Sequence, residues 1–159
     1  MNRRSTLAAA AVGLSFAVFA ASSFAQPTMK TVAGTYSAVT VAAFGDKPRG
    51  MLILAPDGNY VALVGRAQLA PVASGVRTTA TDAENKALVD GSIAHYGRWS
   101  IDDGGKVITF HVEMSSFPNW DRKPQKRVLK STGETLTYTV AAPSTGGAPN
   151  DVSWRRIKK

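Results

Sequence analysis

Short runs of β-branched, aromatic and aliphatic residues, each ended by turn-forming residues, dominate the sequence after residue 34. In the clearest run, 107–115, apolar and polar residues alternate at the period of a half-buried strand. A turn of Pro, Asp, Gly and Asn at 56–59 joins two apolar runs as a hairpin. This spacing is typical of a sandwich or a barrel, and eight closed strands enclose packed side chains or one small ligand. The predicted strands are 35–42, 51–55, 60–64, 96–102, 107–115, 125–130, 136–140 and 152–157.

One short helix is expected among these strands. Thr81 and Glu84 have the spacing of a capping box, in which each side chain satisfies an amide near the helix start. Ala87 and Leu88 follow at helical spacing, and Gly91 is suited to end the helix. The sequence therefore predicts a helix over 81–91.

Residues 1–25 have the build of an export signal. A pair of arginines precedes an apolar run over 7–21, and Ser23 and Ala25 supply the small residues of a cleavage site. We expect cleavage after Ala25 and a periplasmic or secreted domain over 26–159. A retained anchor and a twin-arginine signal are the alternatives. No later segment is apolar enough to hold the cleaved chain in a membrane, so no integral membrane protein is expected.

The composition limits the kinds of catalysis, metal site and partner that the chain can have. The chain has no cysteine, which excludes disulfides, thiolate catalysis and cysteine-ligated metals. It carries 19 basic and 11 acidic residues, a formal charge of +8, or about +6 without the two arginines of the signal. The charge is dispersed, which argues against nucleic-acid binding. Of the two histidines, His95 directly precedes the predicted strand 96–102 and His111 lies in the strand 107–115. They lack metal-ligand spacing, so we expect no metal and no cofactor.

His111 and Glu113 share one face of the run over 107–115 and are the candidate catalytic residues. Inside a barrel, the imidazole and the carboxylate would support acid–base chemistry such as isomerisation or cyclisation. The alternative is that this face meets solvent, because the opposite face of the run is apolar.

The candidate ligand-binding residues combine an apolar wall with a few groups that can orient a ligand. Arg127 suits both oxygens of a carboxylate or phosphate, although a solvated basic edge is the alternative. Trp120, in a loop bracketed by prolines, can cap the barrel mouth or anchor the rim, and Tyr138 can orient a ligand or belong to the core. The full set is Phe110, Val112, Met114, Trp120, Arg127 and Tyr138. The side chains expected to face inward are Ile53, Trp99, Phe110, Val112, Met114, Leu136 and Tyr138.

Several short sequence blocks follow one another in a distinctive order between Gly34 and Arg156. The blocks are 34–36 (GTY), 48–52 (PRGML), 56–58 (PDG), 81–87 (TDAENKA), 111–115 (HVEMS), 117–120 (FPNW), 125–127 (QKR), 133–137 (GETLT) and 154–156 (WRR). Their order resembles the lipocalin-like domain family. Two positions depart from the family pattern: Tyr36 replaces a tryptophan, and Asp121 replaces a small or apolar residue. The resemblance implies an all-β fold, a single antiparallel up-and-down β-barrel of about eight strands with one short helix.

Closing such a barrel requires the first strand to pair with the last. Tyr36 on the first strand can then stack under Arg155 or Arg156 in a cation–π contact. Trp154 and Arg156 share a strand face, so Arg156 is the expected partner if Trp154 points inward. We therefore expect Tyr36, Trp154 and Arg156 to close the barrel.

These features predict an exported protein that binds a small hydrophobic or amphipathic molecule in the barrel mouth, and they favour a binding protein over an enzyme. One alternative is a small β-barrel enzyme that uses His111 and Glu113. Another is a barrel without a cavity that interacts with anionic envelope components through its basic surface.

Overall fold

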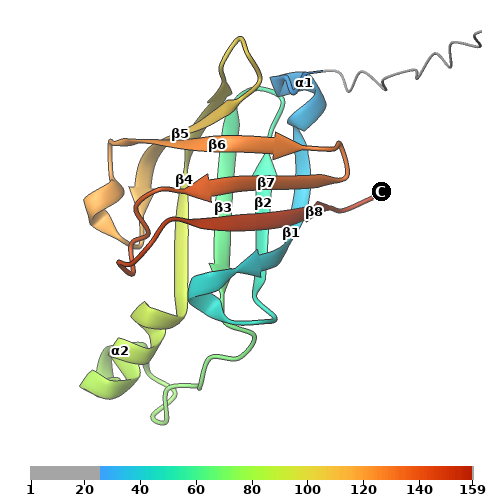
Figure 1. Ribbon diagram of the computed structural model, residues 1–159. Coiled ribbons are helices and arrows are strands. Elements are labelled where there is room, and N and C mark those ends of the chain that lie inside the picture. The colour runs from blue at the N-terminus through green and yellow to red at the C-terminus, as the bar shows by residue number, and fades with distance from the viewer. Residues whose placement is uncertain (1–25, 159) are drawn as a thin grey trace, which may run out of the picture.

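The computed structural model describes residues 26–158, which form a closed antiparallel β-barrel (Figure 1). Each of the eight strands pairs with the next one along the chain, and β8 pairs with β1. The predicted up-and-down barrel is thereby confirmed, whereas the predicted export signal lies outside the described residues. The strands are β1 (Gly34–Val41), β2 (Arg49–Leu54), β3 (Asn59–Gly65), β4 (Ser92–Ile101), β5 (Val107–Ser115), β6 (Pro124–Ser131), β7 (Thr135–Val140) and β8 (Asn150–Arg156).

The predicted helix is present as α2 (Asp82–Gly91), and Thr81 and Glu84 form its capping box. The sequence analysis missed a second helix, the four-residue α1 (Met29–Val32), which is too short to show a period. It also missed three single-turn 3₁₀ helices: η1 (Ala42–Phe44), η2 (Arg77–Thr79) and η3 (Pro118–Trp120). Within residues 26–158, no helix has the length and apolar character needed to cross a bilayer.

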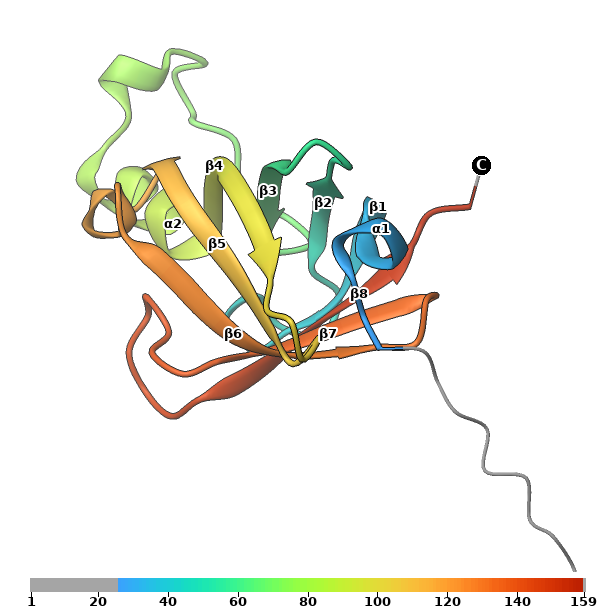
Figure 2. The ribbon, with the colours of Figure 1, turned by 90° about the horizontal axis from the view of Figure 1, so that it is seen from above.

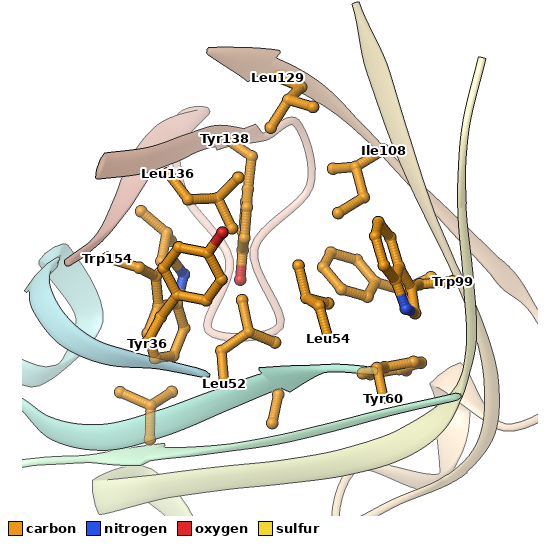
Figure 3. Close-up of a cluster of buried hydrophobic side chains, with 14 of the residues drawn as sticks. Tyr36, Leu52, Leu54, Tyr60, Trp99, Ile108, Leu129, Leu136, Tyr138 and Trp154 are labelled. Carbon is orange, nitrogen blue, oxygen red and sulfur yellow. The ribbon is translucent and has the colours of Figure 1, made fainter. Parts of the chain in front are cut away.

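Inward side chains fill the half of the barrel that lies nearest α1 (Figure 3). Six large ones are at most 2% exposed: Tyr36, Leu52, Leu54, Trp99, Ile108 and Leu136. Burying a side chain of this size stabilises the fold by about 1.5–3 kcal/mol. The prediction that Ile53 faces inward is wrong, because it lies between two inward leucines and is 40% exposed. The run over 51–55 is apolar throughout, so its sequence does not reveal which alternate residues face the core.

A β-bulge reverses the facing of residues at the end of β5. Glu113 is the extra residue there, because Tyr96 pairs with Met114 while Gly97 already pairs with Val112. Beyond the bulge Met114 turns outward and is 57% exposed, whereas Ser115 is buried. The predicted inward position of Met114 is therefore wrong. Gly97 permits the close approach, since a Cβ on it would meet the backbone oxygen of His111 at 2.1 Å.

The helix α1 seals the end of the barrel at which β1 begins (Figure 2). Its Val32 is buried, and the Tyr36 hydroxyl donates to the Val32 carbonyl oxygen at 2.5 Å. The Arg156 guanidinium lies over the Tyr36 ring, 4.7 Å from its centroid, and donates to the carbonyl oxygens of Thr31, Ala33 and Gly133. One side chain of β8 thus joins α1, β1 and the β6–β7 turn.

Replacing Arg156 with alanine tests this closure. Arg156→Ala removes the cation–π contact and leaves partly buried carbonyl oxygens without donors. We expect the free energy of unfolding in urea to fall by about 2–4 kcal/mol. Arg155→Ala is the matched control, because Arg155 is the exposed neighbour on the same strand, and its effect should stay within about 0.5 kcal/mol. Equal effects of the two substitutions would contradict the role of Arg156.

Candidate ligand-binding cavity

The barrel is hollow at the end opposite α1, where β1, β3 and β7 end and β4, β6 and β8 begin. The cavity has a volume of about 70 Å³, several times the 10–15 Å³ or so that one water molecule requires. Most of its wall is apolar, and the loop after β7 and the helices η1 and η3 form its rim. This cavity argues against the alternative of a barrel without a cavity. The wall includes Val41, Ala43, Phe44, Ala62, Val64, Ile93, His95, Phe110, Trp120, Gln125, Arg127, Tyr138, Val140, Val152 and Trp154.

Aromatic rings form one continuous side of this wall. Phe110 of β5 lies between Tyr60 and Tyr138, with ring centroids 4.8 and 5.5 Å away, and all three rings meet at tilted or edge-on angles. His95 of β4 continues the cluster to Trp120 at the rim, with centroids 5.6 Å apart. Such rings present flat apolar surface and keep their rotamers when a ligand enters, which favours binding of an apolar molecular body.

The loop that carries Trp120 is held against the end of β5. The Asp121 carboxylate accepts a hydrogen bond from the Ser115 backbone N–H at 2.6 Å, and the Arg122 N–H donates to the Val112 oxygen at 2.9 Å. The bulge thus positions the rim, because it turns Ser115 inward toward this loop. Asp121 thus has a specific structural role in placing Trp120.

Arg127 points into the barrel and is 7% exposed, while Lys126 and Lys130 on the same strand point outward. Its guanidinium donates to the Lys126 carbonyl oxygen and the Gln125 Oε1, both at 3.1 Å, and its Cζ lies 5.7 Å from the centroid of the Trp120 ring. Burial lowers the pKa of Arg127, but an arginine stays charged in proteins. The basic edge considered from the sequence therefore comprises the lysines and not Arg127.

One buried donor beside the cavity lacks a well-formed hydrogen bond. The Trp154 indole Nε1 is buried and has no partner at hydrogen-bond geometry among the described residues. Its polar neighbour is the Tyr138 hydroxyl, whose pKa the indole N–H lowers in opposition to burial. Burial raises the pKa of Tyr138 to about 12, so its hydroxyl remains a proton donor at neutral pH.

His95 is the site residue that the sequence analysis considered only as a weak metal ligand. Its Nδ1 lies 2.8 Å from the Tyr60 hydroxyl. Burial, helped by the charge on Arg127, lowers the pKa of His95 to about 4, so the imidazole is neutral at pH 7. Burial also raises the pKa of Tyr60. The strand parity of His95, two residues after Ile93 and four before Trp99, was a signal in the sequence that it faces inward.

His111 and Glu113 lie on the outer face of β5 and do not reach the cavity. His111 is exposed, with its Nε2 3.1 Å from the Ser100 hydroxyl, and Glu113 occupies the bulge. The predicted acid–base pair inside the barrel is therefore not formed. Val112 is buried without lining the cavity, and Met114 is outside. Within residues 26–158, no cluster of three metal-ligating side chains occurs.

Two comparisons with known proteins bear on this architecture. A sequence model described as a lipocalin-like domain matches residues 28–157, which includes all eight strands, α2 and α1 with its capping residue Thr28. The search of curated proteins finds no matching relative.

The buried imidazole predicts a pH dependence of stability. The pKa of His95 is about 4 in the folded chain and about 6.5 when unfolded, so between these values the unfolded chain binds more protons. The free energy of unfolding should therefore fall as the pH drops from about 6.5 toward 4. Because part of the side chain still reaches the surface, we expect a loss of about 1–3 kcal/mol.

Urea unfolding between pH 7 and pH 4 measures this loss in the protein and in two variants. His95→Gln should flatten the pH dependence in this window, because glutamine does not titrate. His111→Gln, at the exposed histidine, should leave it in place. If the pH dependence survives in His95→Gln and disappears in His111→Gln, it arises from His111, and the prediction for His95 is wrong.

Proposed function

Because the chain belongs to the lipocalin-like domain family, we propose that it binds a small hydrophobic or amphipathic molecule in the barrel cavity. The observation that carries this proposal is the unequal filling of the barrel. Large side chains occupy the half nearest α1, whereas the other half holds a cavity of about 70 Å³. A barrel that served only as a stable scaffold would gain packing energy by filling that space.

The cavity wall supports reversible binding of an apolar body. Removing apolar surface from water contributes about 25 cal/mol per Å², from which the ordering of ligand and protein subtracts. The Phe110 and Tyr138 rings pack on each other, and the Trp120 ring packs on His95 and Arg127, so little further ordering is needed. Preformed walls of this kind favour a binding protein that releases its ligand unchanged.

We also propose that the protein acts outside the cytoplasm. The support is the sequence of residues 1–25, a short basic segment followed by an apolar run and small residues up to Ala25. Export would leave the domain from residue 26 onward in the periplasm or in the medium. There, a carrier with a closed β-barrel protects an apolar molecule from water without needing disulfides, and the chain has no cysteine.

Two fluorescent probes, neutral N-phenyl-1-naphthylamine and anionic 8-anilinonaphthalene-1-sulfonate, test the cavity as the binding site. We expect at least one of them to bind saturably. Ala43→Phe places a ring in the cavity from η1 and should weaken that binding about tenfold or more, since the ring occupies the ligand space. Ala42→Phe is the matched control, because Ala42 is the exposed neighbour in the same turn and does not line the cavity. Absence of saturable binding of both probes, or equal effects of the two variants, would overturn the proposal.

A further inference from the structure

The cavity holds a buried cation without an anion. Of the five N–H groups of the Arg127 guanidinium, two donate to neutral oxygens and three have no protein acceptor among the described residues. No aspartate or glutamate lines the cavity. The Trp154 indole Nε1 adds a second buried donor without a partner.

From this donor surplus we propose that the natural ligand is an amphipathic organic oxyanion, a carboxylate or a sulfonate, whose anionic group binds Arg127. The inference rests on the proposed binding function and names the class of ligand. A buried charge is costly unless a counter-charge and hydrogen bonds compensate it, and here the protein supplies only neutral partners. An oxyanion would supply both, because the planar guanidinium binds two oxygens side by side.

The surroundings of Arg127 also define the rest of the ligand. The guanidinium lies near the Trp120 ring, and Phe110 and Tyr138 form the wall on the inner side. His95, the other titratable base of the wall, is neutral at pH 7 and does not compete for the anion. The cavity thus offers one cationic group in a mostly apolar wall of aliphatic and aromatic side chains, with neutral polar residues at Gln125 and along the rim. This lining suits a flat or short-chain apolar body with one anionic group.

The two naphthalene probes share one ring skeleton and differ in the sulfonate, so their affinities separate the charge contribution from the apolar contribution. We expect the dissociation constant of the anionic probe to be at least about tenfold lower than that of the neutral probe. Arg127→Met should abolish that preference, so that the affinities of the two probes become equal within about twofold. Lys126→Met is the matched control, because it removes the same charge from the outer face of the same strand and should preserve the preference. Octanoate should displace the bound probe at lower concentration than octanol.

Thermal unfolding of the free variants separates ligand binding from a structural role. If Arg127 serves the ligand, Arg127→Met removes an uncompensated buried charge and the Tm stays equal to that of Lys126→Met or rises. A Tm several degrees lower would assign Arg127 to the fold and count against the proposal. If both probes bind equally tightly and Arg127→Met changes neither, the anion inference is wrong while the proposed function stands. If neither probe binds, the proposed function itself fails.

A second, independent feature lies on the outside of the barrel. Six apolar side chains of β2 to β5 face outward and are each 40–57% exposed: Met51, Ile53, Val61, Leu63, Tyr96 and Met114. They are neighbours across the sheet, because Ile53 pairs with Val61, Val61 with Tyr96, and Tyr96 with Met114, while Met51 pairs with Leu63. The outer face of β6 to β8 instead carries mainly lysine, threonine and serine. A contiguous apolar patch of this kind marks an interaction surface.

We infer that this patch docks on an anionic lipid bilayer. Arg49 continues the outer row of β2 beyond Met51, and Arg98 continues that of β4 beyond Tyr96, so exposed cations border the apolar centre at two ends. The Arg98 guanidinium also donates to the Asn59 Oδ1 and to the Asp57 carbonyl oxygen. The acids beside the patch are Glu113 on β5 and Asp57, which interacts with the charge of Arg98. Lipid phosphates complement these arginines, and each basic residue near an anionic membrane adds about 1 kcal/mol of attraction.

Co-sedimentation with vesicles of phosphatidylcholine and phosphatidylglycerol tests the docking. Leu63→Glu and Val128→Glu introduce the same charge at side chains that are 55% and 57% exposed, one inside the patch and one on β6. We expect Leu63→Glu to lower the bound fraction at least about fivefold more than Val128→Glu, and pure phosphatidylcholine to bind less. Equal effects of the two variants would overturn the inference. So would a concentration-dependent dimer in sedimentation velocity that Leu63→Glu disrupts, because it would assign the patch to a second copy.

Discussion

The pairing of β1 with β8 is the constraint on which the rest of the molecule depends. It turns a meander of eight strands into a tube with no free edge between the first and last strands, and so creates an inside. Arg156 reinforces that pairing from the last strand, because it lies over Tyr36 and donates to carbonyl oxygens near α1. The side chain that reinforces the closure of the barrel therefore also holds α1 at its sealed end. An open sheet would have neither a cavity nor a closed bottom to limit the depth of a ligand.

The two halves of the barrel have different tasks. The half around Leu52, Trp99 and Leu136 is close-packed and supplies most of the apolar burial. The other half leaves space unfilled and buries the Arg127 charge against neutral partners, both of which lower stability. Burial in the packed half offsets this cost, although both halves belong to one buried cluster in which Phe110, Tyr138 and Trp154 also line the cavity. The unfilled space can admit the body of a ligand, and the uncompensated charge beside it can bind an anionic group without prior rearrangement.

Alternation and turn residues predicted the strands but left both a sandwich and a barrel open, and the resemblance to the lipocalin-like domain family indicated the barrel. The helix α2 was predicted because its capping box is local. Prediction from the sequence failed where facing depends on partners. Ile53 lies in a run that is apolar on both faces, so nothing local distinguishes the inward residues. Met114 was misplaced because the bulge at Glu113 depends on the approach of Gly97 from the neighbouring strand. Arg127 could be identified as a candidate by its type, but its lack of an acidic partner is a property of the assembled cavity.

In a closed barrel the cavity wall and the outer surface are opposite faces of the same sheet. Strand parity sends Arg127 inward and its neighbours Lys126 and Val128 outward, so a single strand contributes to both surfaces without coupling them. The strands that present apolar side chains to the exterior, β2 to β5, also contribute Ala62, His95 and Phe110 to the cavity wall. If the outer patch contacts a bilayer, a single layer of β-sheet separates the cavity from the lipid. An amphipathic anion leaving the membrane would then meet the open end of the barrel within a short distance, and the buried arginine would replace its lost headgroup contacts.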